Sequence, residues 1–223
     1  ERILNDDPET VRTTVTDRYL PKRDPNSGGS IYIYGFGLTR SAHMIARQFG
    51  HKAVFDLLMQ RSPGWLRLIQ AAEINDEALF HEIVQKHPTL FAKLTANASR
   101  RIIGTAIRNN DRAVKLLLEA GWPANPAMDN NQTSLHYAAW HGNLAMVQSL
   151  LSHNASVNIF ETEHGGSPLA WALHGSLHGW HRKQGDYPAV ACALLASGAT
   201  IPKPDKPLEA TEEVLEVIGQ HVP

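Results

Sequence analysis

A repeated spacing of apolar residues constrains the fold of this chain more than any other feature. Four apolar residues stand four, five, eight and nine positions after each of a series of reference residues, which are Gly50, Asn75, Asn109, Gly142 and Asp186. Residues four positions apart lie one above the other on a helix. The pattern therefore predicts a series of similar helices, each with one buried face.

A second helix is predicted just before each reference residue. Seven, four and three positions before Gly142 stand Leu135, Ala138 and Ala139, and the second and third units repeat this pattern of one large and two small residues. The fifth unit differs only in having Leu173 at the last of these positions. Small residues let paired helices approach closely. The first unit has His43 and Arg47 at two of these positions, so we expect its first helix to pack less well.

One unit carries a recognisable motif. Residues 133–139 read Thr-Ser-Leu-His-Tyr-Ala-Ala, residues 167–172 read Ser-Pro-Leu-Ala-Trp-Ala, and Asn109 and Gly142 are 33 residues apart. In motif and period, residues 28–200 resemble the ankyrin-repeat family. The resemblance implies an all-α solenoid of about five helix–turn–helix units with short β-like finger loops. It also implies that His136 braces the turns and that the chain binds another protein or peptide.

The ends of the chain differ from the repeats. Residues 1–30 are predicted to hold the end of a truncated upstream repeat plus a loop, because Ile3 to Pro8 echoes Ile83 to Pro88. We therefore expect further repeats or another domain of the same polypeptide upstream. A short strand is predicted at residues 31–34, within an ankyrin domain spanning 31–200. A polar C-terminal capping helix is predicted within 201–223, with Val214, Leu215 and Ile218 facing inward.

The intervals between reference residues are unequal. They measure 25, 34, 33 and 44 residues. The short first interval leaves room only for a direct turn at residues 62–64. The long last interval predicts an insertion at about 175–186, after a helix that is expected to end at Gly175. Insertions into rigid repeats often carry function, so this segment is a candidate site.

Aromatic side chains gather near that insertion. In ankyrin repeats the concave face is lined by positions five and two residues before each reference residue. Here these positions hold Tyr137 and Trp140, then Trp171 and His174, with His141 and Trp180 expected nearby. These six residues are the predicted partner-binding site, because aromatic residues dominate binding hot spots. The alternative is that the insertion covers the rings and only seals the end of the stack.

The histidines of the insertion allow a second hypothesis. His174, His178 and His181 would point the same way on one continuous helix, and zinc takes such ligands. Gly175 and Gly179 interrupt that spacing, so solvated loop histidines and no metal are the default expectation. The alternative function is a small-molecule or metal-dependent enzyme site over the aromatic cluster. We predict no cofactor and no catalytic residue, and Asp186 is expected to cap the following helix.

Composition excludes some partners. Lys and Arg number 21 against 22 Asp and Glu, so no net field attracts nucleic acid or an acidic membrane. No apolar run reaches the length of a membrane span. The single cysteine, Cys192, rules out an internal disulfide and predicts an intracellular, cytoplasmic protein.

Overall fold

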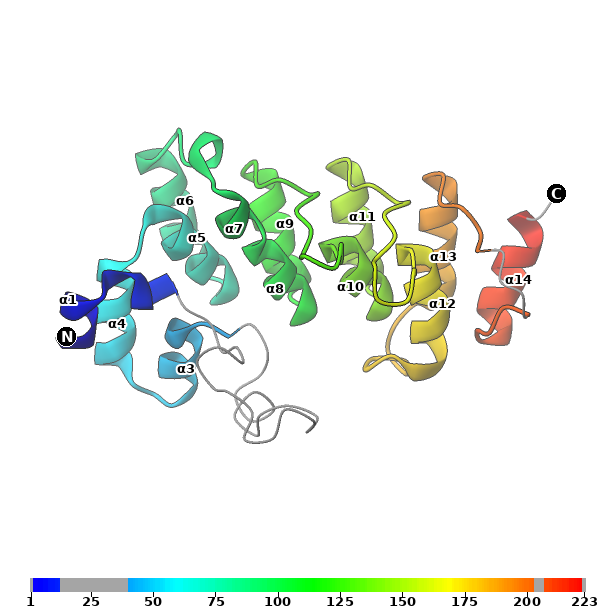
Figure 1. Cartoon of the computed structure of the whole chain (residues 1–223), viewed down its shortest axis with the longest axis horizontal. Coiled ribbons are helices and arrows are strands. Elements are labelled where there is room, and N and C mark those ends of the chain that lie inside the picture. The colour runs from blue at the N-terminus through cyan, green and yellow to red at the C-terminus, as the bar shows by residue number, and fades with distance from the viewer. Residues whose placement is uncertain (1, 13–39, 203–206, 222–223) are drawn as a thin grey trace. The chain divides into compact units, whose positions relative to one another are not determined.

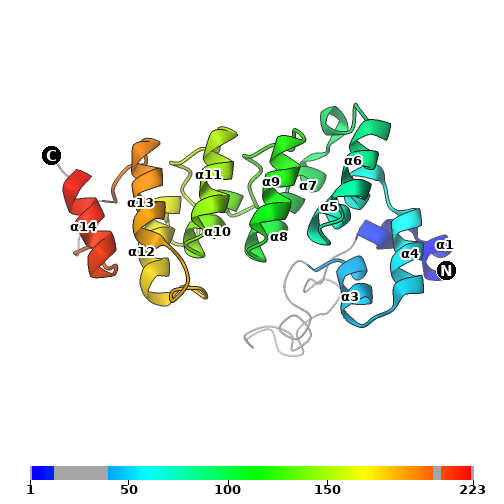
Figure 2. The same ribbon diagram turned by 180° about the vertical axis from the view of Figure 1, so that it is seen from behind.

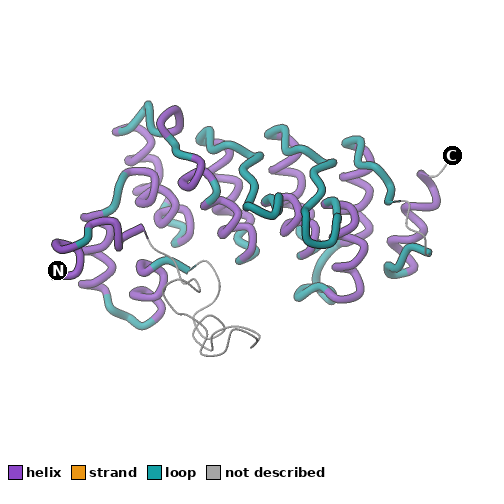
Figure 3. Tube along the Cα trace, in the orientation of Figure 1, coloured by secondary structure: helices purple, strands orange, loops and turns teal. Residues whose placement is uncertain are grey.

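The computed structural model describes residues 2–12, 40–202 and 207–221. The described chain is mostly helical and contains no strand (Figure 3). It divides into two compact units, Glu1–Ala92 and Lys93–Pro223. The predicted all-α class is confirmed. The strand expected at 31–34 and residues 13–30, where the loop after the upstream repeat was expected, lie outside the described residues.

Unit 1 contains short helices around a small apolar core. Its elements are α1 (Arg2–Asp6), the 3₁₀ helix η1 (Pro8–Arg12), α3 (Ala42–Gln48), α4 (Lys52–Arg61), α5 (Gly64–Glu73) and α6 (Glu77–Lys86). Leu4, Val11, Ala46 and Leu58 form one buried cluster. The link between α4 and α5 is only Ser62 and Pro63, as the short interval predicted.

The helix pattern of unit 1 holds with one correction. Val54, expected on the buried face of α4, is 48% exposed. The first helix packs less well, as expected, since only His43 and Ala46 of α3 are buried, against six residues of α5. The His43 ring is itself fully buried, and its Nε2 lies 2.8 Å from the Ser62 hydroxyl oxygen. That hydroxyl donates in turn to the Leu58 carbonyl. The imidazole is therefore accommodated by a hydrogen-bonded chain that links α3 to the end of α4.

Unit 2 is a regular stack of helix pairs. After the short η2 (Phe91–Lys93) its helices are α7 (Ala96–Ser99), α8 (Arg101–Ile107), α9 (Asp111–Glu119), α10 (Ser134–Trp140), α11 (Leu144–Ser152), α12 (Pro168–His178), α13 (Tyr187–Ala196) and α14 (Glu212–His221). The first helices of the pairs, α8, α10 and α12, pack in one row, and α9, α11 and α13 pack in a second row (Figures 1 and 2). The predicted repeat of helix pairs is confirmed.

The reference residues mark the turn inside each pair. Gly50, Asn75, Asn109 and Gly142 all have positive φ, between 57° and 71°. The following residue then caps the second helix in most units; Asn143, for example, accepts a hydrogen bond from the backbone N–H of Met146. Asp186 departs from the series, since its φ is −94°, although its carboxylate still caps α13 as predicted. The insertion has thus replaced the tight turn of the fifth unit.

Finger loops join successive pairs (Figure 3). Ala127 and Thr133 form an isolated antiparallel bridge within one finger. The Asn158 amide donates to the Gly198 carbonyl, and its oxygen accepts from the Thr200 N–H at 2.8 Å. Asn125, 33 residues earlier, makes the equivalent pair of bonds to the next loop. These two asparagine side chains therefore each tie one loop to the next.

The C-terminal helix closes the second row. α14 packs on α13 through the buried residues Val214 and Ile218, as expected. Leu215, also expected to face inward, is 36% exposed. The buried face of α14 is therefore narrower than predicted.

Candidate binding surface

Five rings from two helices and the insertion meet in unit 2. We call Tyr137, Trp140, Trp171, His174 and Trp180 the aromatic surface. Trp171 of α12 packs edge-on against Tyr137 and Trp140 of α10, with ring centres 5.2 and 6.1 Å apart. Trp140 also contacts His174 at 5.7 Å and Trp180 at 6.1 Å. The structure therefore brings these predicted residues together, with Trp140 at the centre.

The aromatic surface is only partly covered. Tyr137, Trp140 and Trp171 are half-buried, His174 is exposed and Trp180 is 64% exposed. Burial, together with the charges of Glu163 and Glu161, raises the pKa of Tyr137 to about 12. Its hydroxyl donates a hydrogen bond of 2.5 Å to the Gln132 side chain. Tyr137 is therefore a fixed neutral ring, whereas Trp180 presents most of its area to solvent.

Close contact between α10 and α12 positions the rings. The sequence predicted that the first helix of the fifth pair ends at Gly175, but α12 continues to His178. This prediction was wrong because Gly175 serves helix packing and not termination. A Cβ at this position would lie 2.8 Å from the Trp140 carbonyl oxygen, closer than any side chain tolerates. The glycine lets α12 pass directly over the end of α10.

The insertion folds back onto the turn between α10 and α11. The backbone N–H of Asp186 donates to the Gly142 carbonyl at 2.9 Å. A Cβ at Gly185 would lie 2.6 Å from the His141 carbonyl oxygen, so this approach also requires glycine. His181 then lies against His141, with ring centres 5.0 Å apart, and Trp180 lies 5.6 Å from the same ring.

The four histidines near the insertion form two pairs. His174 and His178 are neighbours on α12, with ring centres 4.6 Å apart. Burial and then the nearby His178 lower the pKa of His174. His181 turns away to His141, so among the described residues the predicted triplet does not form a three-ligand group. The sequence missed the His141–His181 pair because nothing in the spacing indicated which turn the insertion would contact.

His136 has the structural role that the resemblance implied. Its Nδ1 accepts from the Thr133 N–H at 3.2 Å, and its Nε2 donates to the Gly166 carbonyl at 3.2 Å. Burial lowers the pKa of His136, which keeps the ring neutral. It therefore joins the start of α10 to the next finger.

A buried carboxylate organises that finger. Glu161 is 1% exposed and accepts hydrogen bonds from the backbone N–H groups of Glu163, His164 and Gly166 at 2.7–3.1 Å. Burial acts to raise its pKa, but these hydrogen bonds outweigh it and the net shift is downward. Glu161, Glu163 and His164 also bring ligand-type atoms within 4.8 Å of one another. Because the Glu161 oxygens already bind the loop backbone, we assign this group to finger structure.

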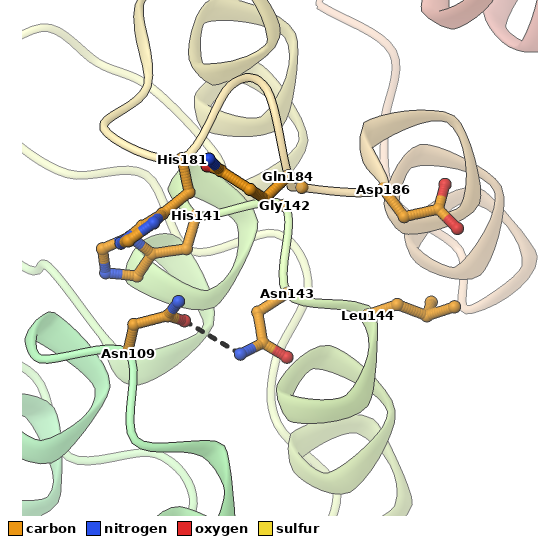
Figure 4. Close-up of a pocket in the computed structure, with 9 residues that line it drawn as sticks. Asn109, His141, Gly142, Asn143, Leu144, His181, Gln184 and Asp186 are labelled. Carbon is orange, nitrogen blue, oxygen red and sulfur yellow. Dashed lines mark hydrogen bonds between the residues drawn. The ribbon is translucent and has the colours of Figure 1, made fainter.

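A depression of about 280 Å³ lies beside the insertion, on the turn side of the helix pairs. Figure 4 shows its lining, in which His141 and His181 lie against each other while the Asp186 carboxylate points away from them. Asn143 donates to Asn109 across its floor at 2.8 Å. Neither Tyr137 nor Trp171 lines this depression. The hypothesis of an enzyme pocket over the aromatic cluster stays a prediction.

Comparison with known proteins places the chain in a family. The model of "Ankyrin repeats (3 copies)" matches residues 43–161 and 103–203. A 111-residue stretch is 32% identical to "Probable E3 ubiquitin-protein ligase XBOS32" from Oryza sativa subsp. japonica, and covers 49% of this chain but only 22% of the rice protein. No helix in the described residues has both the length and the hydropathy to cross a membrane. Ankyrin repeats act as protein-interaction modules. By the family match and the stack of helix pairs, this chain belongs to the ankyrin-repeat family.

Proposed function

We propose that the chain binds a partner protein through the aromatic surface at the C-terminal repeats. The observation that carries this proposal is the continuous run of rings from Tyr137 through Trp171 and Trp140 to Trp180. Two helices, α10 and α12, hold the first three of these rings half-exposed. Rigid aromatic side chains bury much area on binding and lose little conformational entropy. A partner segment would lie along the α10–α12 face.

The charges near the rings suggest the chemistry of the partner. The charge of the exposed Glu163 helps to raise the pKa of Tyr137. The charge of Glu209 likewise acts to raise the pKa of His174, against the larger effect of burial. Acidic groups therefore stand at both ends of the aromatic surface. A segment with Lys or Arg next to apolar residues would meet these carboxylates and also place its cations over indole faces.

The insertion adds Trp180 to this surface. Its indole touches both Trp140 and His141, so the insertion extends the surface beyond the helices. Because 64% of Trp180 is exposed, its removal should change binding with little effect on folding. This makes Trp180 the most informative position to test.

The test is a peptide selection followed by affinity measurements. Peptides selected from a random library on the purified chain should be enriched in basic and apolar residues. Trp180→Ala should weaken the best selected peptide roughly tenfold or more, as expected of a hot spot. Phe160→Ala is the matched control, because Phe160 is similarly exposed (53%) but lies on a finger.

Circular dichroism of each variant would establish that the helices remain. If Phe160→Ala weakens binding while Trp180→Ala and Trp140→Ala do not, the partner occupies the fingers and the aromatic surface is wrong. The ligase activity in the name of the rice relative is not proposed for this chain, since the match covers 22% of that protein.

A further inference from the structure

His141 presents an unused nitrogen in a buried position. Its Nε2 lies 3.0 Å from the Ile107 carbonyl oxygen. A carbonyl oxygen only accepts, so Nε2 carries the ring proton and Nδ1 is left with a lone pair. This Nδ1 is buried and has no hydrogen-bond partner among the described residues. A buried acceptor without a donor is costly, so its retention needs an explanation.

The bond to Ile107 is the arrangement that orients metal-binding histidines. A ligating imidazole commonly donates its other N–H to a backbone carbonyl or a carboxylate, which fixes the tautomer and aims the free nitrogen at the ion. His141 is 1% exposed and sits at the end of α10, so its ring cannot turn freely. The nitrogen that a metal would use is therefore already oriented.

A second imidazole stands at a fitting distance. The ring centres of His141 and His181 are 5.0 Å apart, and the planes meet at 62°. Two imidazoles bound to one tetrahedral zinc, at Zn–N distances of about 2.0–2.1 Å, place their ring centres roughly 5 Å apart. Both residues line the depression of about 280 Å³, which gives water access to the remaining coordination positions.

We propose that His141 and His181 bind one divalent transition-metal ion of the zinc class, with solvent from the depression completing its coordination. The ion connects the insertion to the turn after α10, which Ile107 in turn ties to α8. It acts as a clip that holds the insertion, and with it Trp180, in place. This site differs from the one predicted from the sequence, because His141 is the second ligand beside His181 and the two histidines of α12, His174 and His178, take no part.

The experiment titrates ZnCl₂ into the metal-stripped full chain, produced without a histidine tag, by isothermal calorimetry. We expect saturable binding of one ion, and a zinc-dependent rise in melting temperature because the ion binds the folded state. His181→Ala should weaken binding roughly tenfold or more and remove the thermal shift. His178→Ala is the matched control, because it removes a nearby histidine of the other pair, and it should change neither result.

The His141 side chain gives a second readout that does not depend on a variant folding. Histidine ¹⁵N spectra of the unsubstituted chain should show that zinc moves the Nδ1 resonance of His141 while Nε2 stays protonated. Absence of saturable zinc binding would overturn the proposal. So would full affinity in His181→Ala, or loss of binding in His178→Ala, which would place the ion on α12.

Discussion

The Tyr187 hydroxyl donates a hydrogen bond of 2.9 Å to the carbonyl oxygen of Trp140. The bond joins the first residue of α13 to the last residue of α10. The same carbonyl oxygen is the atom that a Cβ at Gly175 would meet. The Trp140 carbonyl oxygen therefore contacts both α12 and α13. Trp140 is also the residue at the centre of the aromatic surface.

Tyr187→Phe should lower the free energy of unfolding by about 1 kcal/mol, the usual net value of such a hydrogen bond. The ring is 3% exposed and would keep its packing. The change in the free energy of unfolding therefore measures the loss of the hydroxyl and of the hydrogen bond to the Trp140 carbonyl. Urea denaturation followed by tryptophan fluorescence measures the change. Equal midpoints for the two proteins would mean that water replaces the hydroxyl and that the link is not needed.

Two helical glycines should respond in opposite directions to alanine. In exposed helices the change Gly→Ala stabilises the fold by up to about 1 kcal/mol. A Cβ added at Gly219 in α14 would point into open space, with no neighbouring side chain within 4 Å. Gly219→Ala should therefore raise the melting temperature. Gly175→Ala should lower it, because the added methyl would meet the Trp140 carbonyl at 2.8 Å. Thermal denaturation of the two variants compares them directly; stabilisation by both would show that α12 can shift away from α10.

Glu161→Gln should destabilise unit 2 by roughly 1.5–3 kcal/mol at neutral pH, because three backbone N–H groups lose a charged acceptor and the new NH₂ group cannot accept. The pKa of Glu161 is lowered by folding, so its contribution is complete above the unfolded pKa and is lost as pH falls through the folded one. The difference between variant and parent should therefore shrink in acid. Glu163→Gln is the control, since Glu163 is exposed, and it should be nearly neutral.

His43 should make unit 1 sensitive to acid. Burial lowers its pKa from 6.5 to about 4, so the folded state keeps the ring neutral while the unfolded chain gains a proton. Stability is complete above pH 6.5 and falls between pH 6.5 and 4, by up to about 3 kcal/mol. His43→Leu should remove that part of the slope in a series of urea titrations from about pH 7 to 4. An unchanged slope would contradict the assignment to His43.

The periodic part of this fold could be predicted from the sequence, because each helix buries one stripe of apolar residues and the stripes repeat at fixed offsets. The positive-φ turns at Asn109 and Gly142 follow from the same register. The same register overstated the width of the buried face at Val54 and Leu215, which are exposed. Another prediction failed where a residue serves a contact between distant segments. Gly175 was interpreted as a helix end, although its lack of a side chain serves the approach to Trp140.

The candidate site, too, could be predicted in part from the sequence. Tyr137 and Trp140 stand three residues apart, as do Trp171 and His174, and the ankyrin resemblance implies that both pairs line the concave face, so their grouping could be predicted. The position of His181 depends on the path of the insertion, which is set by backbone contacts such as that between Asp186 and Gly142. No pattern within the insertion encodes that contact, and the pairing with His141 therefore emerged only in three dimensions.

The bond from Asp186 to Gly142 has a practical consequence for protein engineering. It returns the chain to the repeat register before α13 begins, so substitutions between Gly179 and Gly185 should alter the insertion while the stack on either side is kept. Libraries that randomise these positions, with both terminal glycines retained, would vary a binding loop on a constant scaffold. The fifth repeat would then serve as a graft site for new specificities.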